Sequence, residues 1–218
     1  MTRHNLNDYQ AKERYQSSKI VDSYEKERFQ SWYGHLAHQI EIETFEKTLD
    51  RYCSKPGTVL DLPCGTARLF PPLLRRGYYV TGGDISEEML SFARERFKSE
   101  PHVSFLKMEA ERLPFSAGHF DYLTSYRLMC HLPREVQKLV LSEMLRVVRK
   151  IIILNYHFSS LAPLALFNGI FRRYCLPIDP LSEKELTIEI ERLGGKVLEI
   201  SRLSWYERSS ALVVIQKN

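Results

Sequence analysis

Short apolar runs alternate with amphipathic stretches along the middle of the chain, and this alternation is the main structural signal. The runs that predict strands are Thr58–Leu62, Tyr78–Gly82, Val103–Leu106, Phe120–Ser125 and Ile151–Leu154. The stretches between them space their apolar residues as helices do. Strands that alternate with helices in this way predict an α/β fold, a mostly parallel sheet with helices on both faces.

Helix boundaries follow from residues that start and stop helices. Ser86, followed by two acids, predicts a helix start, and another helix is expected over Arg134–Val148. The helix expected over Thr66–Arg76 contains Pro71 and Pro72, which only a first turn tolerates. We therefore expect that helix to start or restart at the prolines.

The last third of the chain has a different pattern. A capped helix over Ser182–Leu193 precedes two strands, Lys196–Trp205 and Ala211–Lys217. The connection between these strands is short enough for antiparallel pairing. Before them lies an apolar helical insert, Leu161–Tyr174, which could pack into the core or make a peripheral membrane contact.

Residues 1–50 show helical patterns and no strand signal, so we expect an N-terminal helical cap. His35–Tyr52 spaces its apolar residues as one amphipathic helix. Aromatic residues crowd this region, Trp32 and Tyr33 among them. They either attach a helical arm to the body of the protein or line a pocket for an apolar or aromatic substrate.

Composition narrows the class of protein. A chain of 218 residues with 44% hydrophobic and 27% charged residues suits a single globular domain, 1–218. The net charge of +4, with no Lys/Arg run longer than a pair, argues against a nucleic-acid partner.

The cysteines and the apolar runs favour a cytoplasmic protein. Cys53, Cys64, Cys130 and Cys175 lack the paired spacing of metal sites, so no metal is expected and the thiols should be reduced. The polar N-terminus does not resemble a signal peptide. No apolar run approaches the length of a membrane span.

Acidic residues follow the predicted strands at the edge where parallel sheets bind ligands. Asp61 closes the first strand before the turn Pro63–Ala67, Asp84 follows the second strand, and Glu109 follows the third. An unpaired buried carboxylate is costly, so Asp61 either pairs inside the fold or faces a ligand. No glycine-rich phosphate motif is present. The pattern favours a ligand with a cationic or hydroxyl-rich face.

The chain contains, in order, VLDLPCGTARL, VTGGDISEEML and VSFLKMEAERLPFSAGHFDYLTSYRLMCHLP. This series resembles the motifs of class I S-adenosylmethionine-dependent methyltransferases, in the branch of the ubiquinone and menaquinone C-methyltransferases. The resemblance covers residues 55–155. It implies a Rossmann-like seven-stranded sheet of order 3-2-1-4-5-7-6 with the last strand antiparallel. It also implies a cofactor-binding core over 55–157 and an insert over 158–180 that could serve as a substrate lid.

The resemblance assigns roles along the cofactor, S-adenosylmethionine, whose product is S-adenosylhomocysteine. Asp61 would lie beside the methionine portion, and Pro63, Cys64 and Gly65 would wrap that portion with backbone. Asp84 would accept hydrogen bonds from both ribose hydroxyls. These residues would hold the amino-acid and ribose parts of the cofactor.

The remaining cofactor contacts would come from the later motifs. Ile85 and Met89 would flank adenine. Glu109, one methylene longer than the usual aspartate, would accept from the adenine amino group, and the N–H of Ala110 would reach a ring nitrogen. Tyr126 would lie near the methionine portion and the methyl-transfer region.

The first motif departs from the family pattern, which usually has three glycines. Only Gly65 remains. Pro63 cannot adopt a positive φ, and Ala67 adds a methyl group where the backbone often approaches the cofactor. Cofactor binding is still expected, because Asp61 and Asp84 are both present.

Candidate catalytic residues follow the fourth and fifth strands. Tyr126 and His131 come after the fourth strand, and His157 is expected just outside the fifth, where it could contact substrate. For His131, however, we expect the structural role of capping the following helix. Arg127 could bind an acidic substrate group, but we expect it to form a salt bridge.

The predicted function is methyl transfer to a small, apolar or aromatic acceptor. Two alternatives are a protein or RNA methyltransferase and a non-catalytic protein that binds S-adenosylmethionine. The Asn/Asp-Pro-Pro-aromatic stretch that amino-methylating relatives often carry is absent after the fourth strand. We expect a monomer or a homodimer.

Overall fold

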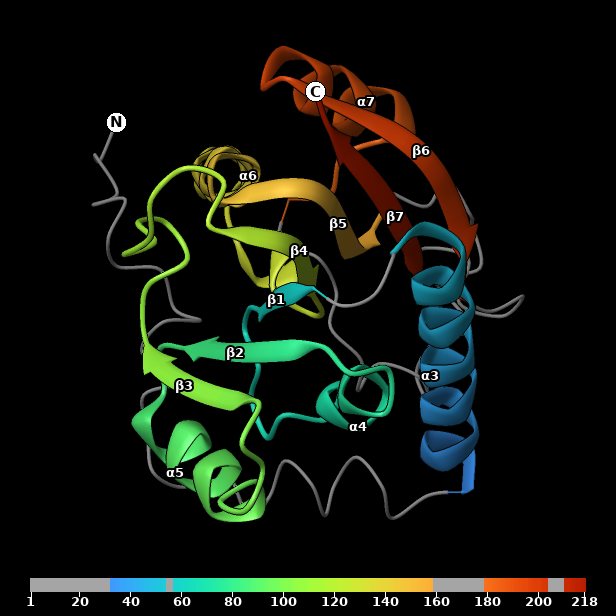
Figure 1. Ribbon diagram of the computed structural model, residues 1–218. Coiled ribbons are helices and arrows are strands. Elements are labelled where there is room, and N and C mark those ends of the chain that lie inside the picture. Colours follow the sequence, from blue (N-terminus) through green and yellow to red (C-terminus); the bar gives the residue numbers. More distant parts are fainter. Residues whose placement is uncertain (1–31, 54–56, 159–178, 204–209) are drawn as a thin grey trace.

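Seven strands form one sheet in the residues that the computed structural model describes, 32–53, 57–158, 179–203 and 210–218. The strands are β1 (Thr58–Asp61), β2 (Tyr79–Asp84), β3 (Val103–Lys107), β4 (Phe120–Ser125), β5 (Val148–His157), β6 (Gly195–Arg202) and β7 (Ser210–Lys217). The helices are α3 (Trp32–Tyr52), α4 (Phe70–Leu74), α5 (Glu87–Arg96), the 3-10 helix η1 (Met129–His131), α6 (Arg134–Val147) and α7 (Glu183–Arg192). The order across the sheet is β3-β2-β1-β4-β5-β7-β6 (Figure 1).

The strand directions agree with the predicted Rossmann-like arrangement. β1 pairs in parallel with β2 and β4, and the same direction continues outward to β3 and β5. β7 runs antiparallel to both of its neighbours, β5 and β6. The carboxyl ends of β1, β2 and β4 therefore meet at one edge, which is where open α/β sheets bind ligands.

Helices cover both faces of the sheet, and each face has its own apolar core. On one face α3, α4 and α5 pack through Phe45, Phe70 and Leu90. On the other face α6 and α7 pack through Met144 and Leu186. All five side chains are fully buried. Alternate residues of each inner strand enter alternate cores, so the sheet is apolar on both sides, as its sequence predicts.

Strand β5 is longer than the predicted run Ile151–Leu154. It extends to His157, because β7 pairs with it from Ile151 onward and places Ser210 opposite His157. The apolar pattern alone could not indicate this extension, since Asn155 and Tyr156 interrupt the aliphatic run.

The helix after β1 is shorter than predicted. Only Phe70–Leu74 is helical, and Pro71 and Pro72 lie in its first turn, as expected from proline chemistry. Gly65 and Ala67 adopt positive φ angles of 51° and 59°, so the backbone before Phe70 cannot be helical. The predicted restart at the prolines is confirmed.

Two predicted N-caps are present. The side-chain oxygen of Ser86 accepts a hydrogen bond from the backbone N–H of Met89 at the start of α5, over 3.3 Å. Ser182 and Glu185 form a reciprocal capping box at the start of α7. These caps satisfy backbone donors that would otherwise lack partners.

Helix α3 includes the amphipathic helix predicted over His35–Tyr52 and begins three residues earlier. Several expectations lie outside the described residues: those for the arm over 1–31, the insert over 159–178 and the connection over 204–209, and for the side chains of Trp32 and Tyr33. The described part contains no helix that is long and apolar enough to cross a membrane.

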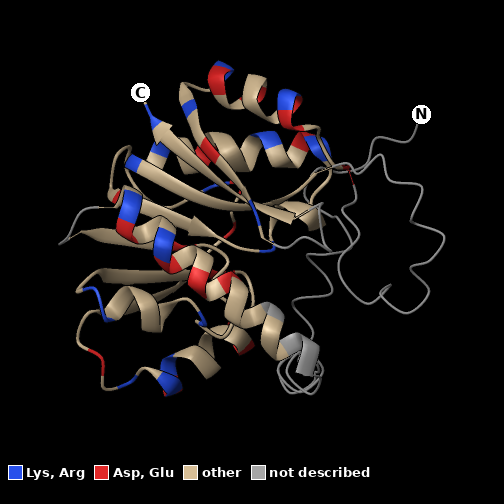
Figure 2. Cartoon of the chain, turned by 90° about the vertical axis from the view of Figure 1, so that its right-hand side faces the viewer, with Lys and Arg blue, Asp and Glu red and all other residues tan. Residues whose placement is uncertain are grey.

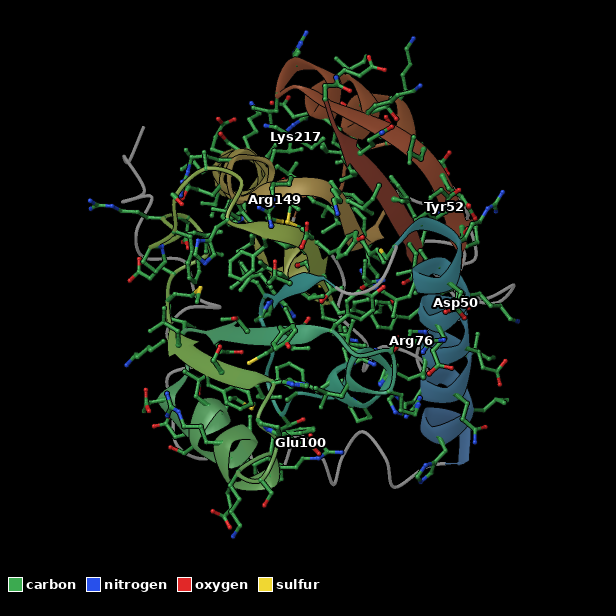
Figure 3. The ribbon with its side chains drawn as sticks, in the orientation of Figure 1. Asp50, Tyr52, Arg76, Glu100, Arg149 and Lys217 are labelled. Atoms are coloured by element: carbon green, nitrogen blue, oxygen red, sulfur yellow. The ribbon has the colours of Figure 1, made fainter. Side chains whose placement is uncertain are left out.

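Charged residues attach α3 to the end of α4. Arg76 and Asp50 point toward one another in Figure 3, with Nε to Oδ1 at 2.7 Å and Nη2 to Oδ2 at 2.9 Å. Arg76 also donates to Glu46 over 3.2 Å, and its side chain is only 13% exposed. Figure 2 shows how acidic and basic residues follow one another along the outer side of α3. This helix is therefore fastened by an apolar inner face and a bidentate ion pair.

We predict that Arg76→Gln lowers the free energy of unfolding by about 1 kcal/mol, because it removes a two-pronged ion pair made by a mostly buried guanidinium with a more exposed carboxylate. Lys98→Gln is the matched control, since Lys98 forms an exposed pair with Glu95 on one helix. That change should cost less than about 0.5 kcal/mol. Urea denaturation followed by circular dichroism measures both, and equal losses would contradict the role given to Arg76.

Candidate functional site

The ends of β1 and β2 are joined by the turn that follows β1. Asp61 ends β1, and Asp84 ends the neighbouring strand β2. The N–H of Gly65 donates to Oδ2 of Asp84 over 2.8 Å, and the N–H of Cys64 donates to the carbonyl of Gly83 over 2.8 Å. Three residues predicted for the cofactor site, Cys64, Gly65 and Asp84, are therefore held together by hydrogen bonds, beside the buried acid Asp61 at the end of β1.

Asp61 is buried and holds one internal partner. Its side chain is 1% exposed, and the hydroxyl of Thr124 on β4 donates to Oδ1 over 2.7 Å. Burial raises the pKa of Asp61 to about 7, although the Thr124 hydrogen bond and the charge of Arg68 act in the opposite direction. The carboxyl group is therefore only partly ionised near neutral pH. A cation placed beside it would favour the ionised form.

Asp84 uses both carboxylate oxygens to organise backbone. Oδ2 accepts from Gly65, and Oδ1 accepts from the N–H of Ser86 over 2.9 Å. Burial raises the pKa of Asp84, while hydrogen bonds from Ser86 and Gly65 oppose that rise. Each carboxylate oxygen can accept more than one hydrogen bond. Asp84 can therefore accept hydroxyl donors without releasing the turn.

The turn after β1 accommodates both departures from the glycine pattern. Its positive φ angles fall at Gly65 and Ala67 and not at Pro63, whose peptide bond with Leu62 is cis. Ala67 is fully buried. A residue other than glycine in this conformation costs about 1 kcal/mol, so the surrounding structure must hold the turn in place.

The segments predicted to surround adenine meet at Asp84. The N–H of Met108 donates to the carbonyl oxygen of Asp84 over 2.9 Å, which fixes the start of the loop after β3 to the end of β2. Ala110 in this loop is buried, whereas Glu109 exposes its side chain. The four residues predicted for adenine lie on these two segments: Ile85, Met89, Glu109 and Ala110.

Tyr126 lies directly after β4 and is 5% exposed. Its ring packs edge-on against Phe45 at 5.7 Å between centroids, and the guanidinium of Arg68 lies 5.1 Å from the ring centroid. Burial raises the pKa of Tyr126 well above its usual value, so the hydroxyl keeps its proton. That hydroxyl is buried and has no hydrogen-bond partner among the residues that the structure describes. Such a group commonly marks a place for a ligand or water.

Glu41 of α3 connects the turns that follow β1 and β4. Its carboxylate lies 2.9 Å from Nη1 of Arg68 and 3.4 Å from Nη2 of Arg127. The salt bridge expected for Arg127 is therefore confirmed. Arg127 also has a positive φ of 58°, which is uncommon for a residue with a long side chain.

Two expectations for histidines are wrong. His157 does not lie beyond the fifth strand, because it is the last residue of β5 and is 7% exposed. The N-cap of α6 is Pro133 and makes no side-chain hydrogen bond, so His131 does not occupy the cap position. His131 ends η1 and remains partly exposed.

Three residues at this site were absent from the sequence prediction. Thr124 pairs in register with Asp61 across β1 and β4, so the strand order together with the strand positions could have indicated it. Arg68 and Glu41 are 27 residues apart and belong to a turn and to the N-terminal helix. No local pattern connects them.

The cysteines in the described part show no sign of a shared role. Cys53, Cys64 and Cys130 are all buried. Burial raises the pKa of the Cys64 thiol well above its usual value, and the charges of Asp84 and Asp61 add to this. The described residues contain no group of three or more His, Cys, Asp or Glu side chains that could hold a metal ion.

Residues 59–150 match the family of methyltransferase domains. The phosphatidylethanolamine N-methyltransferase of Cereibacter sphaeroides is 34% identical over 127 residues, which are 56% of this chain and 61% of that protein. The demethylmenaquinone methyltransferase of Beutenbergia cavernae is 34% identical over 131 residues, 57% of this chain and 51% of that protein. The matches thus span between half and two thirds of these relatives' own lengths.

A solved structure extends the comparison to nearly the whole chain. The crystal structure of magnesium protoporphyrin IX methyltransferase from Synechocystis PCC 6803, with bound S-adenosylhomocysteine, has a TM-score of 0.73 at 18% identity. The alignment covers 92% of this chain and 98% of that one. At this identity the likeness shows a shared fold.

The fold, the order of the motifs and the family match all indicate the same class of protein. The protein has the fold of the class I S-adenosylmethionine-dependent methyltransferases. Residues 59–150 are a methyltransferase domain of that class, and the resemblance found in the sequence is confirmed.

The residues at the strand ends fit S-adenosylmethionine, the methyl donor of this class. The donor carries an ammonium group, a ribose with two hydroxyls and an adenine. Asp61 and Asp84 offer buried oxygen acceptors on neighbouring strands, and both retain acceptor capacity in this structure. The hydroxyl of Tyr126, which has no hydrogen-bond partner in the described ranges, lies after β4, the other neighbour of β1. The polar groups at these strand ends and their spacing therefore suit an extended ligand with a cationic end.

We predict that Asp61→Asn stabilises the ligand-free protein at pH 8 but not at pH 4. The folded carboxyl group has a pKa of about 7 against 3.8 in the unfolded chain, so the folded state binds more protons between these values. Stability is then lost as pH rises through that window, by up to about 4 kcal/mol. A gain of about 1–3 kcal/mol for the variant at pH 8 is expected in urea denaturation.

Asp121→Asn is a control that should change the stability at pH 8 in the opposite direction. Although burial tends to raise the pKa of Asp121, hydrogen bonds from Thr58 and Lys150 lower it below the usual value. This variant should therefore lose stability at pH 8 and lose little near pH 3. If Asp61→Asn also loses stability at pH 8, the carboxyl group of Asp61 is not held at the raised pKa.

Proposed function

We propose that this protein transfers a methyl group from S-adenosylmethionine to a small, apolar or aromatic acceptor. The observation that carries the proposal is the placement of acidic residues at adjoining strand ends. Asp61 ends β1, Asp84 ends β2, and Glu109 follows β3, in the order of the sheet. An extended ligand lying across these ends would meet the three acids in sequence.

Each part of S-adenosylmethionine would have its own partners in the protein. Asp61 would accept from the ammonium group, whose charge would favour the ionised carboxylate. Asp84 would accept from the ribose hydroxyls. Glu109 and the N–H of Ala110 would contact adenine, with Ile85 and Met89 against its faces. The turn Pro63–Gly65 would enclose the methionine portion.

Methyl transfer from a sulfonium needs alignment more than acid-base chemistry. Holding the acceptor atom in line with the methyl group can supply about 7–11 kcal/mol of the barrier in favourable cases. Tyr126 is the group that we place beside the reacting atoms, because its hydroxyl is buried, protonated and without a partner in the described part. His131 is the candidate for a base where the acceptor must lose a proton. His157, buried within β5, is a weaker candidate.

The acceptor class is inferred from the relatives and from the sequence. The matching proteins are named for phosphatidylethanolamine and demethylmenaquinone, which are small-molecule acceptors. We propose that residues 1–50 and 158–180 cover a core over 55–157 and contribute apolar surface to the acceptor site. We also propose that the protein is a monomer or a homodimer in the cytoplasm, as its cysteine spacing predicts.

Calorimetric titration with S-adenosylhomocysteine tests the donor site. We predict that the wild type binds it and that Asp84→Asn weakens binding at least about 30-fold, because a charged acceptor of two hydroxyls is lost. Asp121→Asn is the control, since Asp121 is a partly buried acid at the opposite end of the strands. It should bind as the wild type does.

Transfer of label from methyl-labelled S-adenosylmethionine tests the acceptor class. Incorporation into hydroquinones or phenols that extract into organic solvent would support a small acceptor. Incorporation into protein or RNA alone would contradict it. Binding without any transfer to these probes would favour the non-catalytic alternative, and an absence of binding would contradict the donor site itself.

A further inference from the structure

Two side chains of α6 hold the loop over residues 108–118, and neither belongs to the predicted cofactor contacts. Arg146 donates from Nη1 to the carbonyl of Phe115 over 2.6 Å and from Nη2 to the carbonyl of Leu113 over 3.0 Å. Glu143, one turn earlier, accepts the N–H of Leu113 over 2.7 Å. Three backbone groups of one loop are thus bound by a single helix.

The two side chains also bind each other. Arg146 donates from Nε to Oε1 of Glu143 over 2.7 Å and from Nη2 to Oε2 over 2.8 Å. These charged hydrogen bonds lower the pKa of Glu143, so Glu143 stays ionised. The two parallel hydrogen bonds between Arg146 and Glu143, here called the fork, therefore keep their orientation. The backbone carbonyl of Arg146 accepts from Gly118 over 2.8 Å, which fixes the far end of the loop.

The loop has little freedom between its anchors. Its start is bound to Asp84 through Met108, and the N–H of Arg112 donates to the carbonyl of Glu109 over 3.2 Å to close a turn. Ala110 lies inside that turn, three residues from the anchored Leu113. The position of the Glu109–Ala110 segment therefore depends on the pair Glu143–Arg146 as well as on β2.

We propose that Glu143 and Arg146 are positioning residues that set the selectivity of the site for the amino group of adenine. The inference rests on the proposed function, because it takes adenine to lie against Glu109 and Ala110. Neither side chain needs to touch the donor. They act by keeping the carboxylate of Glu109 and the N–H of Ala110 at a fixed separation from the ribose acceptor.

The test compares S-adenosylhomocysteine with S-inosylhomocysteine, in which an oxo group replaces the adenine amino group. The wild type should prefer the adenosyl compound at least about 10-fold in calorimetric Kd. Arg146→Lys keeps the charge but cannot reach two carbonyls and Glu143 with one ammonium group. We expect this variant to reduce the preference to less than about 3-fold, mainly by weakening the binding of the adenosyl compound.

Arg134→Lys is the matched control. Arg134 lies on the same helix and pairs with Glu185, but it contacts no part of the loop in the described structure. This variant should keep the wild-type preference. Glu143→Gln, which keeps the shape but weakens the fork, should reduce the preference in the same direction as Arg146→Lys.

The outcomes separate this inference from the proposed function. If the role of Arg146 is purely structural, Arg146→Lys should weaken the binding of both ligands by the same factor. The ratio of their Kd values would then be unchanged, which would overturn the inference. An unchanged ratio in both Arg146→Lys and Glu143→Gln would do so as well. A wild type that binds neither compound would instead contradict the proposed function. One that binds both equally would contradict the placement of adenine.

Discussion

The hydrogen bond from the N–H of Gly65 to the carboxylate of Asp84 is the contact on which the site depends. It joins the turn after β1 to the end of β2 and satisfies a buried acid with a backbone donor. The same aspartate fixes the start of α5 through Ser86, and its carbonyl accepts from Met108 at the start of the next loop. One residue thus sets the relative positions of the three segments that carry the proposed cofactor contacts.

This arrangement has a cost that the rest of the fold must offset. Asp61 and Asp84 are buried with raised pKa values, and Ala67 and Arg127 adopt positive φ angles. Unfavourable conformations of this kind persist where the surrounding structure determines them, and they concentrate at functional sites. Here the support comes from an apolar core on each face of the sheet and from Glu41, which binds the turns after β1 and β4.

Much of the fold could be predicted because local signals agree with it. Apolar runs located the strands, Ser86 and Ser182 located helix starts, and Pro71 and Pro72 located the start of α4. The prediction was wrong where pairing over long distances decides the outcome. β7 extends β5 to His157, and no local pattern in residues 155–157 indicates this.

The candidate site could likewise be predicted where local signals exist, and not where contacts join residues far apart in the sequence. Asp61, Gly65 and Asp84 could be recognised from their positions after strands and from the motif series. Thr124, the partner of Asp61, could be placed only once the strand order was known. Glu41 could not be placed from the sequence, because it binds Arg68 from a helix far away in the chain. Arg146 and Glu143 are a further example, because their importance appears only when the loop lies on α6.

Amide hydrogen exchange with and without S-adenosylhomocysteine tests the central claim most directly, namely that one ligand spans the ends of β1, β2 and β3. If one ligand spans these ends, exchange should slow on binding in three segments, residues 61–69, 82–90 and 107–115, with no change in β6. Protection confined to other segments, or none at saturating ligand, would contradict it.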